Sequence, residues 1–402
     1  MFRQNVRLAP YSNYRIGGEA RFFFEGSSTE EIIAAVREAK RRAIPVFVWG
    51  GGTNVLVDDG GFSGLVLSPK ISMLECNGNI VRVGAGISMN ELTAFAAREG
   101  LDGLAWAGGL PGTVGGAIRG NAGAFGGEIK DSLVHVTSID MRHNPPRLVK
   151  RGKEECAFAY RSSVFKEQGG QEIILEAGFL LAYGDKKEIL MRTDEKIGYR
   201  NMKHPLEYPN IGSIFKNVPV SSLPARFVNA RTPVKNDPLP VVPVAFLISE
   251  AKLRGVSYGG AMISPKHANF IVNAMHASSN DVESLIALIE AEATPSTLFH
   301  DAGGAPGIRT SSTHYFRGQP LALQLGERID ALLGLPRSHA EPMQGQRYRA
   351  GEQYRHHSDH FRTERDHWQR ERTRGGQRSW TAMLYLNAVE AGGATDFPRL
   401  GL

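Results

Sequence analysis

The sequence contains few cysteines and no long apolar run. Only two of its 402 residues are cysteines, Cys76 and Cys156, which excludes a disulfide framework. No stretch of about 18 apolar residues occurs, so no membrane-spanning helix is expected. The N-terminus lacks an apolar core followed by a small-residue cleavage site, so no secretory signal is visible. We therefore expect a soluble cytoplasmic protein that does not bind membranes.

Charge excludes little by itself. The 47 Lys and Arg against 41 Asp and Glu give a net charge of +6, which fits an anionic ligand. The sequence has no lysine-rich run, no zinc-finger spacing and no basic stripe with interleaved aromatic residues. We expect a monomer with no nucleic-acid partner, and a phosphorylated small molecule suits the mild positive charge equally well.

Lysine is absent from the last quarter of the chain. All 14 lysines lie at or before Lys266, whereas His300 to Leu402 contains 14 arginines and no lysine. One domain seldom changes its basic residues so abruptly. The shift predicts a junction near Glu292, between residues 1–292 and a separate segment, 293–402.

Apolar periodicity predicts helices and strands that alternate irregularly, which favours an α+β protein of several lobes. The expected helices are residues 28–42, 89–98, 186–199, 279–291 and 321–333, and the expected strands are 45–49, 55–57, 64–67, 80–83 and 173–181.

Two segments are rich in glycine. The run from Gly50 to Asn54 follows a predicted strand, where it could admit a pyrophosphate to backbone N–H groups or form a tight hairpin. Between Gly100 and Gly127, eleven of 28 residues are glycine. Here Pro111 is expected in the first turn of a short helix. Two such loops in one lobe would suit an extended cofactor such as FAD.

Two further segments carry polar groups of interest. Arg161 beside Tyr160 could hold a carboxylate or phosphate, or could be a surface arginine over an aromatic ring. Ser213 follows Gly212 and could donate a proton, or could simply be a turn serine. No G-x-S-x-G elbow is present, which argues against a hydrolase triad.

Taken in order, these segments resemble the UDP-N-acetylenolpyruvoylglucosamine reductases, flavoenzymes of peptidoglycan synthesis. The resemblance covers about residues 1–292. The matching motifs are NYRIGGEA (13–20), GGGTNVLV (50–57), GLPGTVGGAIRGNAGAFGGE (109–128), YRSSVFK (160–166), YPNIGSIFKN (208–217) and GGAMISPKHANFIVN (259–273).

The resemblance implies an α+β fold with three lobes. Lobes 1–70 and 71–200 would form an FAD-binding domain, and lobe 201–292 would bind the UDP-sugar. NADPH would reduce the flavin. The cofactor-binding residues carried over are Gly50, Gly51, Gly52, Thr53, Asn54, Gly108, Pro111, Gly112, Thr113, Gly115, Gly116 and Gly123.

It also implies catalytic roles. Arg161 matches the arginine that stabilises an enolate-like intermediate, and Ser213 matches the proton donor. The positions matching substrate-binding residues are Tyr160, Lys203, Asn217 and His267.

The chain departs from the family pattern at two places. Residues 218–243 look like an insertion. After the predicted helix 279–291, the family continues into a strand with a catalytic glutamate, which is not found here, since neither Glu290 nor Glu292 matches it. A flavin-binding protein without turnover is therefore an alternative to the reductase.

The C-terminal segment contains an H-x-D pair. On a strand, His357 and Asp359 would point to one face and supply two of the three ligands of an iron site, although a solvated charged strand is the alternative. Residues 295–402 resemble prolyl 4-hydroxylase-type dioxygenases, which use Fe(II) and 2-oxoglutarate. The resemblance implies a partial double-stranded β-helix with an incomplete iron site. The junction, the missing strand and the abrupt stop together suggest an origin in two joined, truncated reading frames. A dioxygenase is thus a third candidate function.

Overall fold

The computed structural model describes residues 2–223, 232–236, 240–293, 312–316, 320–333 and 343–347. The chain divides into two compact units, Met1–Ile286 and Ala287–Leu402. The division falls within a helix, close to the predicted junction. Among the described residues, no helix is long and apolar enough to cross a membrane.

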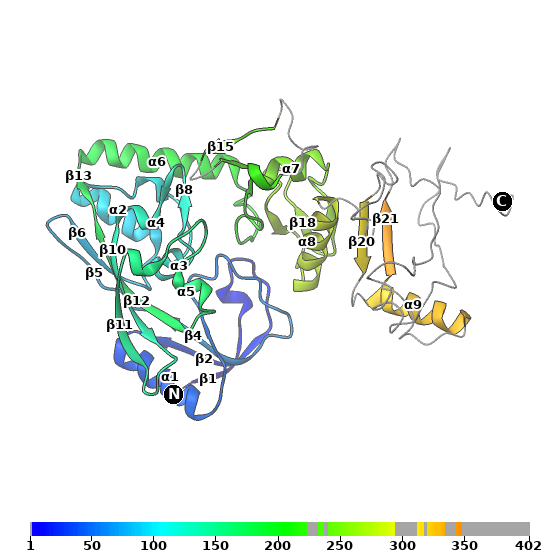
Figure 1. The fold of residues 1–402 in the computed structure, drawn as a ribbon, viewed down its shortest axis with the longest axis horizontal. Coiled ribbons are helices and arrows are strands. Elements are labelled where there is room, and N and C mark those ends of the chain that lie inside the picture. Colours follow the sequence, from blue (N-terminus) through cyan, green and yellow to red (C-terminus); the bar gives the residue numbers. More distant parts are fainter. Residues whose placement is uncertain are drawn as a thin grey trace, which may run out of the picture. The chain divides into compact units, whose positions relative to one another are not determined.

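The first lobe is a four-stranded mixed sheet with one helix (Figure 1). The strand order is β1-β2-β4-β3, in which β1 pairs antiparallel with β2, and β4 pairs parallel with both β2 and β3. Its elements are β1 (Arg3–Arg7), a 3-10 turn (Ala9–Tyr11), β2 (Glu19–Gly26), α1 (Thr29–Arg41), β3 (Val46–Val48) and β4 (Phe62–Pro69).

The helix α1 begins as the sequence predicts. The side chain of Ser28 accepts a hydrogen bond from the backbone N–H of Glu31, which satisfies one of the donors left free at a helix start. Its buried side chains Ile32 and Val36 share a core with Leu65 of β4 and with Ile139 and Ile173 of the next lobe. The first two lobes therefore share one hydrophobic core.

The second lobe is built on a five-stranded antiparallel sheet of order β11-β10-β12-β6-β5. The long helix α6 runs beside α2 in this lobe (Figure 1). The strands are β5 (Leu74–Asn77), β6 (Ile80–Gly84), β7 (Leu101–Asp102), β8 (Gly123–Ala124), β9 (Gly127–Glu128), β10 (Leu133–Asp140), β11 (Arg147–Gly152), β12 (Glu172–Leu180) and β13 (Ala182–Tyr183). The helices are α2 (Met89–Glu99), α3 (Val114–Arg119), α4 (Ile129–Ser132), α5 (Val164–Glu167) and α6 (Lys186–Lys203), with 3-10 turns at Ala105–Ala107 and Glu154–Cys156.

The third lobe contains two small antiparallel sheets, β14-β16-β15 and β17-β18-β19. Its elements are β14 (Val218–Pro219), a 3-10 turn (Val220–Ser222), β15 (Lys235–Asn236), β16 (Pro240–Val242), α7 (Val244–Glu250), β17 (Ser257–Tyr258), β18 (Ala261–Ile263), β19 (Ile271–Asn273) and α8 (Ser279–Ala293). The predicted insertion, residues 218–243, therefore contributes one of the two sheets.

Side-chain hydrogen bonds join the third lobe to the first. The hydroxyl of Tyr14 donates to the carbonyl of Ile271 at 2.8 Å, and Asn273 Nδ2 donates to the carbonyl of Tyr14 at 3.0 Å. Asp59 Oδ2 accepts hydrogen bonds from the backbone N–H and the hydroxyl of Ser279 at the start of α8. These contacts fix the last helix of the unit against the loop that precedes β4.

In the C-terminal unit, the described elements are β20 (Ser312–Phe316), α9 (Pro320–Leu333) and β21 (Met343–Arg347). Strands β20 and β21 pair antiparallel. The helix predicted at 321–333 is confirmed. This pair of strands gives no support to the predicted double-stranded β-helix.

One predicted strand is wrong. Residues 55–57 are not paired in a sheet, and the next strand along the chain is β4, which begins at Phe62. Their apolar character has another cause, because Val57 is buried in the core of the first lobe with Leu8 and Phe23. The other strands and helices predicted for residues 1–293 are present, most with ends shifted by one to four residues.

Candidate functional site

The first glycine loop connects two parallel strands. It follows β3, which pairs in parallel with β4, so the hairpin alternative is wrong. Within the part of the chain that the structure describes, the backbone N–H groups from Gly50 to Asn54 donate no hydrogen bond to protein atoms. Successive free N–H groups of this kind form an anion-binding concavity. Gly52 is required for the turn, because its φ is +64° and a Cβ would lie 2.2 Å from the carbonyl oxygen of Tyr11.

The second glycine loop, residues 108–116, is anchored to the connection between β6 and α2. Its N–H groups at Val114 and Gly115 donate to the carbonyls of Ile87 and Ala85. Thr113 begins α3 by accepting a hydrogen bond from Gly116 N. The short helix is thus present and contains Gly115 and Gly116 as expected. Pro111 is not in its first turn, however, because the helix begins only at Val114.

The two glycine loops lie against each other. A Cβ built on Gly51 would lie 2.9 Å from Gly112 Cα, and one built on Gly112 would lie 2.8 Å from Thr53 Oγ1. A Cβ on Gly50 would lie 2.9 Å from Thr113 Oγ1. Residues from two lobes, separated by about sixty positions, thus form one surface of backbone and hydroxyl groups.

Arg161 lies at the edge of the second lobe. Its guanidinium donates to the carbonyls of Asn121 and Gly123 and approaches Glu128 Oε1 at 3.8 Å. Its Cζ lies 5.2 Å from the centre of the Tyr160 ring. The second alternative therefore holds, because the arginine is 35% exposed and lies over the tyrosine ring. The role in holding a carboxylate or phosphate stays a prediction.

Lys166 lies beside Arg161 and is influenced by further positive charges. Lys166 Nζ donates to the carbonyl of Arg161 at 2.9 Å. Burial lowers the pKa of Lys166, and the positive charges of Lys216 and Arg119 lower it further. Lys216, three residues after Ser213, is thus near enough for its charge to act on Lys166. Such a group of cations favours an anionic ligand.

The loop around Ser213 is held by two buried asparagines. Asn210 Oδ1 accepts from Gly212 N at 3.0 Å. Asn269 Oδ1 accepts from Phe215 N at 3.0 Å, while its Nδ2 donates to the Phe215 carbonyl at 2.9 Å. Between these fixed points Gly212 has a φ of +80° and Ser213 is exposed. The side chain of Ser213 is thus exposed on a loop whose two sides are fixed, and its role as a proton donor stays a prediction.

Three other residues were predicted to bind substrate. Asn217 and His267 lie in the third lobe, and Lys203 lies at the end of α6. Lys203 is exposed at the last residue of α6. Asn217 Oδ1 accepts from Val244 N at the start of α7, so one end of its amide is already used. His267 packs edge-on against His204, with ring centres 5.7 Å apart, and against Phe270.

Burial favours the neutral form of both of these histidines. Burial lowers the pKa of His204 to about 4, and the positive charges of Arg200 and Lys266 add to the effect. Burial also lowers the pKa of His267, whose Nδ1 is buried and has no hydrogen-bond partner among the described residues. A neutral imidazole with a free nitrogen can exchange a hydrogen bond with a ligand but cannot form an ion pair.

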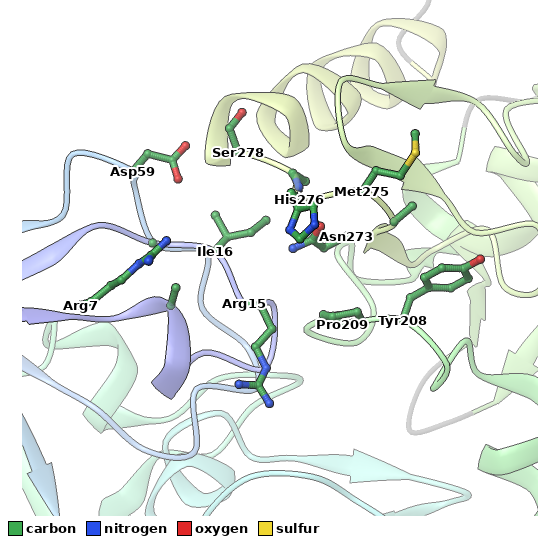
Figure 2. Close-up of a pocket in the computed structure, with 14 residues that line it drawn as sticks. Arg7, Arg15, Ile16, Asp59, Tyr208, Pro209, Asn273, Met275, His276 and Ser278 are labelled. Atoms are coloured by element: carbon green, nitrogen blue, oxygen red, sulfur yellow. Dashed lines mark hydrogen bonds between the residues drawn. The ribbon is translucent and has the colours of Figure 1, made fainter.

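A cavity of about 560 Å³ lies between the first and third lobes. Figure 2 shows Arg7, Arg15 and Asp59 on one side of it and the segment from Asn273 to Ser278 on the other. None of the site residues predicted from sequence lines this cavity. No role was predicted from the sequence for Glu128, Arg200 or Asn269, although Glu128 and Asn269 lie within matched motifs.

The three missed residues have different sequence signals. Glu128 is an acidic residue at the end of a long, nearly uncharged glycine-rich segment, a position that could have marked it. Arg200 Nε donates to the Gly108 carbonyl at 2.9 Å and so supports the second glycine loop. It carries no signal, because it lies among other charged residues of α6. Asn269 lies within a matched motif, but nothing in the sequence marks its role.

The predicted iron ligands, His357 and Asp359, lie outside the described residues. Among the residues that are described, no group of three or more His, Cys, Asp or Glu side chains could hold a metal ion.

Two family models match the chain. Residues 20–142 match an FAD binding domain, and residues 204–297 match the C-terminal domain of UDP-N-acetylenolpyruvoylglucosamine reductase. These matches lie in the N-terminal part and give no support to the dioxygenase resemblance of the C-terminal segment.

Named relatives agree with the family models. The chain is 41% identical over 289 residues to UDP-N-acetylenolpyruvoylglucosamine reductase of Carboxydothermus hydrogenoformans, covering 71% of this chain and 87% of the relative. It is 36% identical over 296 residues to the enzyme of Synechococcus sp. (strain WH7803), covering 73% and 88%.

A solved structure agrees as well. The crystal structure of this reductase from Thermus caldophilus superimposes with a TM-score of 0.58 at 30% identity, covering 72% of this chain and 95% of the other. The mixed α+β fold predicted for residues 1–292 is thereby confirmed. The chain belongs to the UDP-N-acetylenolpyruvoylglucosamine reductase family.

Proposed function

We propose that this chain catalyses the NADPH-dependent, FAD-mediated reduction of UDP-N-acetylglucosamine enolpyruvate to UDP-N-acetylmuramate in peptidoglycan synthesis. The observation that carries the proposal is the meeting of the two glycine loops. Unpaired N–H groups and missing Cβ atoms suit the close approach of a pyrophosphate. Residues 50–54 and 108–116, with Gly123 beside Arg161, would hold the cofactor.

Bound there, FAD would supply the hydride chemistry between NADPH and C3 of the enolpyruvyl group. The chain's own residues would then manage charge and protons. Arg161 would sit beside the substrate carboxylate, where a fixed cation stabilises the negative charge that develops on the enolate. Ser213 would donate the proton to C2, and its exposed position on a fixed loop suits that role.

The remaining substrate contacts are proposed for Tyr160, Lys203, Asn217 and His267. His267 would contribute a hydrogen bond, because burial keeps it neutral. Asn217 would contact the substrate through Nδ2, because its oxygen already accepts from Val244 N. The monomeric state and the cytoplasmic location stay predictions.

The test is to purify the full chain and measure NADPH oxidation with and without the enolpyruvyl UDP-sugar. We expect a yellow protein whose NADPH consumption requires the sugar. A protein that holds flavin but consumes no NADPH with the sugar would instead support the non-catalytic alternative. Succinate release dependent on Fe(II) and 2-oxoglutarate would support the dioxygenase alternative.

The variant Ser213→Ala tests whether Ser213 is the proton donor. In Ser213→Ala, we expect NADPH to reduce the flavin at the normal rate, while reoxidation by the sugar slows by roughly 10²- to 10⁴-fold. Ser257→Ala is the matched control, because Ser257 is an exposed serine on β17 of the same lobe. Normal reoxidation in Ser213→Ala would exclude the serine as the donor.

A further inference from the structure

A buried carboxylate lies behind Arg161. Glu128 ends β9, and its side chain is only 4% exposed. Its two oxygens face two different cations: Oε2 lies 2.9 Å from Lys130 Nζ, and Oε1 lies 3.8 Å from Arg161 Nη1. Glu128 is therefore placed to act on the guanidinium through its charge.

The same guanidinium is held by two backbone carbonyls. Arg161 Nη1 donates to the carbonyl of Asn121, and Nη2 donates to that of Gly123. The backbone of Arg161 has a φ of +55°, a conformation that costs an ordinary residue energy and is kept where the surroundings fix it. The carbonyls and the carboxylate thus constrain one side of the guanidinium and leave the rest accessible.

Gly123 packs directly between the two charged groups. A Cβ built on it would lie 2.8 Å from Glu128 Cγ and 3.0 Å from Arg161 Nη1. Any side chain at position 123 would push the arginine and the glutamate apart. Glycine at this position permits the contact between Glu128 and Arg161.

Stability alone does not account for this arrangement. Removing a carboxylate from water is costly, and a buried ion pair often stabilises a fold no better than apolar residues of similar volume. Lys130 already supplies a closer cation to Glu128. The contact with Arg161 instead restricts where a long, otherwise mobile side chain can point.

We propose that Glu128 is a positioning residue for the reductase reaction: together with the carbonyls of Asn121 and Gly123, it fixes the guanidinium of Arg161 toward the substrate carboxylate. The inference rests on the proposed function, because Arg161 is given its role there. Glu128 itself touches neither substrate nor cofactor. Its removal affects the step in which Arg161 meets developing negative charge.

The two half-reactions separate this role from a structural one. In the proposed reaction Arg161 acts on the substrate alone, so reduction of the flavin by NADPH should not depend on it, whereas reoxidation by the enolpyruvyl sugar should. Glu128→Gln keeps the shape of the side chain and removes its charge. We expect normal flavin content and normal reduction by NADPH, with reoxidation slowed roughly 10- to 100-fold, because small displacements of a catalytic group have effects of that size.

Three further variants sharpen the test. Glu128→Asp restores the charge and is expected to recover part of the reoxidation rate. Asp131→Asn is the matched control, since Asp131 lies on the same turn and, among the described residues, accepts a hydrogen bond from the backbone N–H of Glu128 without pairing with Arg161. In the double variant Glu128→Gln/Arg161→Lys, the loss should be no greater than in Arg161→Lys alone, because both changes remove one interaction.

The following results would overturn or support the positioning role of Glu128. Unchanged reoxidation in Glu128→Gln, or an equal fall in flavin content and in both half-reactions, would overturn the proposal. If the unaltered chain shows no reoxidation by the sugar, the proposed function fails, and a crystal structure of Glu128→Gln decides the inference. A guanidinium displaced from the carbonyls of Asn121 and Gly123 would support positioning by Glu128, and an unmoved one would refute it.

Discussion

The two glycine loops hold each other through backbone contacts, whereas the loop around Ser213 is held by the side chains of Asn210 and Asn269. In the first case the critical property is the absence of a Cβ. In the second it is the presence of a side-chain amide: that of Asn269 hydrogen-bonds both the N–H and the carbonyl of Phe215, as a neighbouring strand would. A surface of the first kind suits a cofactor that lies along the backbone, and one of the second kind suits a single exposed hydroxyl.

The largest expected effect is at the first glycine loop. In Gly52→Ala, the new Cβ would meet the Tyr11 carbonyl at 2.2 Å in a backbone conformation that disfavours alanine. We expect the purified protein to lack flavin and to lose several kcal/mol of stability. Visible absorbance and thermal unfolding measure both. A variant that retains its flavin would show that the loop does not depend on a missing Cβ.

The next effect is at the serine loop. Asn269→Ala removes both hydrogen bonds to Phe215 and leaves two backbone groups without partners, which costs roughly 2–4 kcal/mol. We expect bound flavin to persist, with reoxidation by the sugar slowed. Chemical denaturation and stopped-flow absorbance test this. Loss of flavin together with reoxidation would remove the distinction between the two kinds of loop.

The third prediction concerns the pH dependence of stability that arises from buried His204. The folded pKa of His204 is about 4, below the value of about 6.5 in an unfolded chain. The unfolded state therefore binds the proton first, and this contribution to stability is lost as the pH falls from 6.5 to 4, by roughly 3 kcal/mol. The stability of His204→Phe should fall less over that range. Parallel profiles for the two proteins would contradict the buried neutral state.

The smallest expected effect is at Gly198, a glycine where a side chain would meet no neighbouring atom. Gly198 lies within α6, and no atom lies within 4 Å of a Cβ built on it. Gly198→Ala should therefore stabilise the protein by up to about 1 kcal/mol through helix propensity and leave flavin content unchanged. Thermal unfolding measures this gain. A loss of stability would show that space around a Cβ is a poor guide to the requirement for glycine.

Local sequence patterns predicted the helices and the glycine loops well. Ser28 before Glu31 marks the start of α1, and Gly100 marks the end of α2, because these effects act within one turn. The parallel pairing of β3 with β4 was not predicted, since it depends on strands that meet only after a crossover. For the same reason residues 55–57 were taken for a strand, although Val57 is buried in the core without pairing.

The site residues likewise fall into those that local sequence patterns predicted and those that they did not. Motifs led to the predictions for the Gly50–Asn54 loop, Arg161 and Ser213, because each lies in a long and ordered match to one family. Glu128 and Asn269 act on residues far from them in sequence, 33 positions away for Arg161 and 54 for Phe215. Such partnerships leave no local pattern. The metal site predicted at His357 and Asp359 lies outside the described residues and stays a prediction.

The hydrogen bonds from Tyr14 to Ile271 and from Ser279 to Asp59 span 257 and 220 residues. During synthesis, the first lobe leaves the ribosome long before the strand and helix that complete its contacts exist. Contacts between residues so far apart slow folding, because a long loop must close before they form. The N-terminal lobe therefore waits for β19 and α8, and a chain that ends before them would expose this incomplete surface to aggregation.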